Sequence, residues 1–318
     1  MECNENIVRA AKSLIKDCLG AKKDETILVA TDDGKIDIAY CFAKAGRELG
    51  IETVLVDSHA QAKGEPSKMV ADAMLEADVE FLITTMSYSH TNARIAANKK
   101  GARVASMPMM TMELADNYLD GDYKFIQTVT KKLADMIDKT KVVRVVTEAG
   151  TDLTFKLGGR KCEIDDGNLT QPGCIGNLPA GEAYIAPVET TGDGVLVIDG
   201  VIAYLGQVKD SVKLTLEGGR IREIEGGVSA QELRDFLKDK DSEATGIAEF
   251  GIGTNPKAKL IGSPLLDEKV WGTIHIAFGT NKSMGGERES NIHYDCIINE
   301  PTVYLDGVKI LDKGEHIY

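Results

Sequence analysis

The pattern of apolar runs changes once along the chain, near residue 141, and this change most strongly limits the possible folds. Before it, short runs rich in β-branched residues alternate with amphipathic segments. Uninterrupted apolar runs are typical of parallel strands buried on both faces and joined by helices. The sequence therefore predicts a doubly wound α/β domain over residues 1–141. Its predicted strands are 26–31, 52–57, 81–86 and 103–107, and its predicted helices are 38–49, 67–75, 91–100, 112–118 and 123–139.

From residue 142 the chain reads as pairs of short strands separated by glycine-containing turns. Such pairs are typical of antiparallel sheets. One helix is predicted in this half, over residues 230–240, with Ser229 as its N-cap and Glu232 at the spacing of a capping box. The sequence predicts a mostly antiparallel β domain with this one helix over residues 142–318. Its predicted strands are 142–148, 152–156, 194–198, 201–205, 212–216 and 220–225.

Charge and composition narrow the class of partner. The 318 residues include 37 Lys and Arg against 50 Asp and Glu, a net charge of −13, with no basic block. Because binding to phosphates needs clustered cations, nucleic acid and anionic membranes are not expected as partners. We expect a small-molecule or peptide substrate. The six cysteines show no CxxC spacing, and neither a signal peptide nor an apolar run of ~18 residues is evident, so a cytoplasmic protein with reduced thiols is predicted.

Two histidines lie in apolar, strand-like runs of the second half. His275 stands in Ile-His-Ile-Ala-Phe, and His293 begins His-Tyr-Asp-Cys-Ile-Ile. Because residues i and i+2 of a strand point to the same face, His293 and Asp295 are expected side by side. This pair is either half of a metal site or a hydrogen-bonded pair in the core.

Two glutamates, Glu182 and Glu249, also have apolar and small neighbours. A buried carboxylate is costly without a partner, and a metal ion compensates that cost. The alternative for each is a salt-bridged residue on an edge strand.

Taken in order, these motifs resemble the aminopeptidase T family of metallopeptidases. They are Asn-Leu-Pro-Ala-Gly-Glu at 177–182, Ala-Glu-Phe-Gly-Ile-Gly at 248–253, Leu-Asp-Glu-Lys at 266–269, the His275 segment and His-Tyr-Asp at 293–295. The resemblance implies a homodimeric aminopeptidase with a pair of divalent ions such as Zn, Co or Mn. The implied ligands are Glu182, Glu249, His275, His293 and Asp295.

The resemblance also bears on catalytic groups. Glu249 or Glu182 could share the duty of general base. Lys282 stands seven residues after His275, where the peptidases carry a Tyr, so it marks an altered contact to the transition state.

The sequence is similar, too, to ring-opening dioxygenases that act on 2,5-dihydroxypyridine. That likeness implies a single Fe(II) held by His275, His293 and Asp295, a facial triad. In those enzymes a histidine of the N-terminal domain reaches the substrate, and the likeness implies that role for His90. The alternative is that His90 is a residue at a helix start with no catalytic role. The preferred interpretation is a metal-dependent aminopeptidase because both glutamates are retained. The dioxygenase is the alternative, and a metal-binding protein without catalysis is a third hypothesis.

Overall fold

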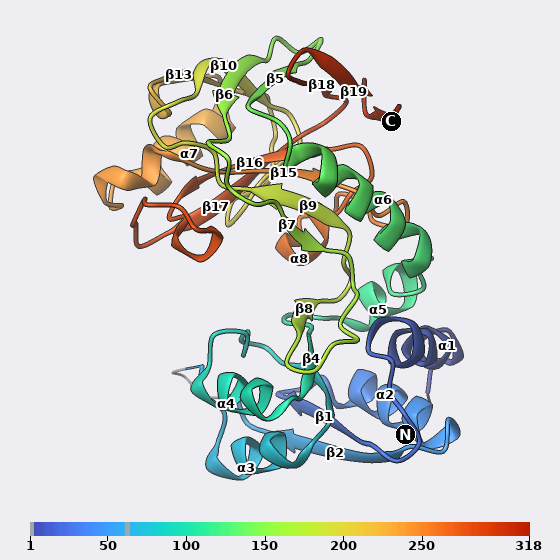
Figure 1. Ribbon diagram of the computed structural model, residues 1–318. Helices are drawn as coiled ribbons and strands as arrows, with labels where there is room; N and C mark the ends of the chain where they lie inside the picture. The colour runs from blue at the N-terminus through green and yellow to red at the C-terminus, as the bar shows by residue number, and fades with distance from the viewer. Residues whose placement is uncertain (1–2, 61–63) are drawn as a thin grey trace. The chain divides into compact units, whose positions relative to one another are not determined.

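The structure, a computed structural model, describes residues 3–60 and 64–318. The chain divides into two compact units, residues 1–127 with 167–180 and residues 128–166 with 181–318 (Figure 1). The division lies within one continuous helix, α6 (Tyr123–Ile137), whereas the sequence placed it at residue 141. The two positions differ because the apolar pattern changes only where the next strand, β5 (Val142–Val146), begins.

The first unit is built on a parallel five-stranded sheet with the order β2-β1-β3-β4-β8. β3 and β4 are buried throughout, although each contains a charged residue, Glu80 in β3 and Arg103 in β4. The strand β8 comes from residues beyond α6 and was not predicted. Its backbone extends the sheet by pairing with β4. The strands are β1 (Thr26–Asp32), β2 (Glu52–Ser58), β3 (Val79–Ile83), β4 (Arg103–Ser106) and β8 (Ile175–Asn177).

Helices lie between these strands, and their starts follow local capping chemistry. The hydroxyls of Ser67, Thr91 and Thr111 each accept a hydrogen bond from the backbone N–H three residues later. An N-terminal helix, α1, with a π-helical turn at Leu14–Cys18, adds to the predicted elements. The helices are α1 (Glu5–Ser13), α2 (Ile36–Glu48), α3 (Lys68–Glu76), α4 (Asn92–Lys100) and α5 (Met112–Tyr118).

The second unit contains two antiparallel sheets, as the sequence predicts for this half. The eight-stranded sheet has the order β14-β13-β10-β6-β5-β18-β19-β20, and the seven-stranded sheet has the order β12-β11-β17-β16-β15-β9-β7. Their strands are β6 (Asp152–Lys156), β7 (Glu163–Asp165), β9 (Glu182–Ile185), β10 (Asp193–Ile198), β11 (Val201–Ile202), β12 (Gly206–Gln207), β13 (Val212–Glu217), β14 (Arg220–Glu225), β15 (Ile247–Gly253), β16 (Ile274–Gly279), β17 (His293–Ile298), β18 (Thr302–Leu305), β19 (Val308–Asp312) and β20 (Glu315–His316).

A single apolar core includes residues of both sheets. Phe155 of the eight-stranded sheet and Phe250 of the seven-stranded sheet meet edge to face, with ring centroids 5.2 Å apart. β6 and β13 of the eight-stranded sheet have buried residues at every second position, whereas β15 and β16 are buried throughout. Polar side chains on β15 and β16 therefore need partners inside the protein.

The remaining helical segments are α7 (Val228–Leu237), α8 (Pro264–Asp267) and two 3-10 turns, η2 (Ser242–Thr245) and η3 (Lys282–Met284). The predicted capping box of α7 is wrong. Gly227 is the N-cap, and Ser229 lies within the helix, where its hydroxyl accepts from the backbone N–H of Lys209. The carboxylate of Asp210 caps the helix from another segment by accepting from the N–H groups of Val228 and Ser229. Among the described residues, no helix is long and apolar enough to cross a membrane.

Candidate metal centre

The five predicted ligands lie on four neighbouring strands of the seven-stranded sheet. In the strand register Glu182 is opposite Gly253, His275 is opposite Gly251, and Asp295 is opposite Ala277. Small residues therefore alternate with ligand-type residues across one face of the sheet. The members of the set are Glu182 on β9, Glu249 on β15, His275 on β16, and His293 and Asp295 on β17.

Gly251 makes space for the ring of His275. A Cβ atom at position 251 would stand 2.0 Å from Nε2 of His275, a distance that real contacts do not reach. The imidazole thus lies directly over the backbone of β15, where only glycine leaves room for it.

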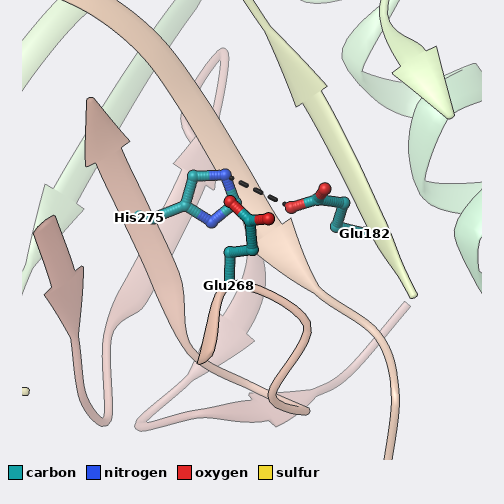
Figure 2. A group of neighbouring side chains, drawn as sticks. All are labelled: Glu182, Glu268 and His275. Atoms are coloured by element: carbon teal, nitrogen blue, oxygen red, sulfur yellow. Dashed lines mark ion pairs between the residues drawn. The ribbon is translucent and has the colours of Figure 1, made fainter. Parts of the chain in front are cut away.

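A first group of ligand-type residues consists of Glu182, Glu268 and His275 (Figure 2). One donor atom from each lies within 4.8 Å of the others. Nε2 of His275 is 3.5 Å from Oε2 of Glu182. Glu268 reaches this group from the segment that follows α8, while the other two side chains extend from strands.

A second group consists of Glu249, His293 and Asp295 and satisfies the same distance limit. Nε2 of His293 lies 3.2 Å from Oε2 of Glu249 and 3.5 Å from Oδ1 of Asp295. The other oxygen of Glu249, Oε1, is 3.1 Å from Nε2 of His275. The Glu249 carboxylate therefore joins the two groups, with one oxygen directed at each histidine.

The backbone fixes the orientation of His293. Its Nδ1 lies 2.8 Å from the carbonyl oxygen of Thr280, so Nδ1 carries the proton and donates it. When the ring is neutral, the lone pair is then on Nε2, which faces the carboxylates. A metal-binding histidine is usually held through its second nitrogen in this way.

Lys269 is buried between carboxylates, two of which belong to the first group. The residue is 1% exposed, and its Nζ lies 2.8 Å from Oε1 of Glu268 and 3.4 Å from Oδ2 of Asp165. Nζ also donates to Oε1 of Glu182. This buried ammonium has three carboxylate partners from three separate segments of the chain.

The donor set suits divalent cations. Five carboxylates lie within ion-pair distance of Lys269 or of the two histidines, those of Asp165, Glu182, Glu249, Glu268 and Asp295. Oε2 of Glu182, Nδ1 of His275 and Oδ1 of Asp295 are buried without a hydrogen-bond partner. Because unpaired buried polar atoms are costly, the excess of carboxylates and these unpaired atoms fit metal ions with O and N ligands.

Burial and neighbouring charges shift the pKa values at this centre. Burial disfavours ionisation of Glu249, but hydrogen bonds from His275 and His293 outweigh it and lower its pKa to about 2. Burial acts against protonation of His275, yet Glu249 and Glu182 raise its pKa to about 9. Burial raises the pKa of Glu182 well above its ordinary value. Glu249 and the two histidines hold each other as ion pairs, which a metal ion would replace.

A small cavity borders both groups. Its lining includes Glu268 of the first group, Asp295 of the second, and the apolar side chains of Val201, Ala203 and Ile297. Its volume is about 10 Å³, close to the space needed by one water molecule.

The structure also locates the other predicted residues. His90 is exposed in the first unit, next to the start of α4, and Lys282 is exposed at the start of η3. Neither belongs to the two groups. Sequence reasoning missed Asp165 and the roles of Glu268 and Lys269. The only signal for the last two was their position in the Leu-Asp-Glu-Lys motif at 266–269.

Comparison with known proteins supplies the family. The family model of 2,5-dihydroxypyridine 5,6-dioxygenase, NicX, matches residues 6–318. The chain belongs to this family. A family member, the 2,5-dihydroxypyridine 5,6-dioxygenase of Pseudomonas putida, is 25% identical over 260 residues, which are 78% of this chain and 73% of that protein.

Aminopeptidases are relatives as well. Aminopeptidase AmpS of Bacillus subtilis is 26% identical over 190 residues, and aminopeptidase T of Thermus aquaticus is 29% identical over 188 residues. Each match covers 53% of this chain but only 46% and 45% of the respective aminopeptidase. The chain thus spans less than half of these two proteins. The expected superfamily relationship is confirmed, and the relatives are enzymes.

Two solved structures share the fold. The 2,5-dihydroxypyridine dioxygenase from Pseudomonas putida has a TM-score of 0.82 at 20% identity and covers 100% of this chain and 98% of its own. Wild-type AmpT from Thermus thermophilus has a TM-score of 0.74 at 17% identity, with 99% of both chains covered. The predicted fold class, an α/β unit followed by an antiparallel β unit, is confirmed.

Proposed function

We propose that this protein is a hydrolase with two divalent metal ions that removes the N-terminal residue of peptides. The observation that carries this proposal is the position of Glu249, whose two oxygens lie 3.1 Å and 3.2 Å from the histidines of two adjacent ligand groups. A carboxylate in that position is suited to bridge two cations.

Each ion would have its own three side chains. Glu182, Glu268 and His275 would hold one, and Glu249, His293 and Asp295 would hold the other, with Glu249 shared. Two such ions supply a Lewis acid for the scissile carbonyl and lower the pKa of a bound water.

The protein's own residues orient this chemistry. His293 is held through Thr280, so its Nε2 stays directed at the centre. Each oxygen of Glu249 faces one histidine, so Glu249 would be a ligand shared by the two ions and not the general base. The cavity beside Glu268 and Asp295 has room for one water, the co-substrate of hydrolysis.

Two of the relatives support the assignment as a hydrolase. AmpS and aminopeptidase T are named aminopeptidases, and both match the chain over 53% of its length. All five residues that the aminopeptidase T resemblance implies as ligands fall within the two groups.

Metal analysis and a substrate assay test the proposal together. We expect about two Zn, Co or Mn ions per chain in protein purified without oxygen. We also expect hydrolysis of amino-acid amides and dipeptides with a free α-amine, and none of their N-acetylated forms. Chelation should abolish activity, and added metal should restore it. One ion per chain, or cleavage of the acetylated substrates, would contradict an aminopeptidase with a dinuclear centre.

A second candidate is a ring-opening dioxygenase that uses one Fe(II). The observation in its favour is the family model, which matches residues 6–318, together with a dioxygenase relative that covers 78% of the chain. His275, His293 and Asp295 would hold the iron. Uptake of oxygen with 2,5-dihydroxypyridine by protein loaded with one Fe(II), without peptide hydrolysis, would favour this candidate.

A further inference from the structure

Lys269 has a rigid main chain. Its backbone N–H donates to the carbonyl of Leu266 at 3.0 Å, and its own carbonyl accepts from Asn255 at 2.9 Å. The backbone of β15 also packs closely here, since a Cβ at Gly253 would stand 2.9 Å from the carbonyl carbon of Lys269. The buried side chain therefore starts from a fixed point and has little freedom.

The ammonium donates a hydrogen bond to one oxygen of each of two candidate metal ligands. Nζ donates to Oε1 of Glu182 and to Oε1 of Glu268, at 2.8 Å for the latter. Oε2 of Glu182 keeps no hydrogen-bond partner and lies 3.5 Å from Nε2 of His275. Lys269 thus holds one oxygen of the Glu182 carboxylate. The second oxygen of Glu182 faces the histidine (Figure 2).

Carboxylates outnumber cations around Lys269. Asp165, Glu182 and Glu268 contribute three negative charges when ionised, and Lys269 contributes one positive charge. Three carboxylates thus face one ammonium, and a bound cation would reduce this excess of carboxylates. The ammonium alone cannot balance this cluster, and without the ammonium the carboxylates would repel each other at close range.

We propose that Lys269 is a positioning residue of the metal centre, which holds Glu182 and Glu268 ready for the ion of the first group. The inference rests on the metal centre of the proposed function. It predicts that the two ions depend differently on Lys269, because among the described residues Lys269 forms no ion pair with Glu249, His293 or Asp295.

The test is a titration of metal-free protein with Co²⁺ alone, followed by equilibrium dialysis and the visible absorption of bound Co²⁺. In Lys269→Met we expect one of two ions to bind about 10–100-fold more weakly, the usual cost of losing an outer partner of a ligand. The second ion should change less than about threefold. Glu268→Gln should weaken the same ion, which assigns it to the first group. Lys269→Arg, which keeps the charge, should recover part of the affinity.

Two further variants separate positioning from general stability. Lys257→Met removes an exposed lysine from the same unit and should bind Co²⁺ as the wild type does. Asp165→Asn leaves Lys269 in place and reduces the cluster's charge, so it should weaken the first ion by about tenfold. If Lys269→Met fails to fold, Lys269→Arg decides the question, because the different shape of its head group should weaken the first ion more than the second. Unchanged affinities, a tighter first ion in Lys269→Met, or equal weakening of both ions would overturn the proposal.

The outcomes for the two proposals are distinct. A wild-type protein that binds only one Co²⁺ would contradict the dinuclear hydrolase. The role of Lys269 would then depend on the affinity of Lys269→Met for that single Co²⁺. An unaltered affinity would overturn the positioning role.

Discussion

Gly251 on β15 lies opposite His275 on β16, so close that a Cβ atom at Gly251 would stand 2.0 Å from the imidazole Nε2. The glycine is thus part of the metal centre, although it has no donor atom. Its φ angle is not positive, so the requirement comes from space and not from backbone conformation.

Gly251→Ala is expected to displace His275 from the first group. We predict loss of one ion per chain and a fall in kcat of about 100-fold, the usual effect of a 1 Å misplacement at an active site. Metal analysis and the amide assay measure both. Gly121→Ala is the matched control, since a Cβ there meets neighbours at 3.5 Å or more. A fully loaded and active Gly251→Ala variant would contradict this role.

Glu249→Gln keeps the size of the side chain but removes the charge between the two histidines. Because each oxygen of Glu249 faces one histidine, we predict weaker binding of both ions, by about 100-fold or more. Competition with a chelator would measure the two affinities. The exposed Glu163 on β7 offers a control, Glu163→Gln, which should bind metal normally. Loss of one ion alone would show that Glu249 does not bridge.

Lys282→Tyr tests the departure from the aminopeptidase T pattern. Lys282 is exposed on η3, so the substitution should leave the stability unchanged. A phenol at this position could donate a hydrogen bond to the oxyanion of a transition state, and one such donor is worth about 100-fold in kcat elsewhere. We predict that kcat for amino-acid amides rises by about tenfold or more. An unchanged kcat would mean that the missing Tyr does not limit the reaction.

Glu80 on β3 makes the first unit sensitive to pH. The residue is 0% exposed, and neither carboxylate oxygen has a hydrogen-bond partner. Burial raises its pKa to about 8, and the charge of Arg94 opposes this only in part. In the folded protein Glu80 therefore keeps its proton at neutral pH, whereas in the unfolded chain it ionises near pH 4.5.

The sign of the effect follows from proton uptake. Between about pH 4.5 and 8 the folded state binds more protons, so the free energy of unfolding falls by about 1.4 kcal/mol per pH unit from this group. Glu80→Gln should lack this decrease, so its melting temperature should exceed that of the wild type by a margin that grows from pH 5 to pH 8 and then stays constant. Thermal unfolding at several pH values measures the margin, with Glu52→Gln on exposed β2 as control. A margin independent of pH would refute the raised pKa.

Local pattern was sufficient for much of the fold. The apolar run of β1 and the alternating pattern of β6 reflect which faces of these strands are buried, so the order of residue types predicts both strands. The expected position of β3 was displaced, since the strand ends at Ile83 and not at residue 86. Capping of α7 was missed because its partner, Asp210, is distant from the helix start in sequence.

For the candidate site, too, some features followed from the sequence and others only from the tertiary structure. Apolar neighbours identified Glu182, Glu249 and His275, and the two-residue period of a strand placed His293 beside Asp295. By itself, then, the sequence determined the class of fold and most of the ligand-type residues, since both follow from short-range pattern. Only the tertiary structure decided that Glu249 lies between two histidines, that Lys269 is buried against three carboxylates, and that β8 joins the parallel sheet. Such contacts join segments far apart in the chain, where no local period constrains which side chains meet.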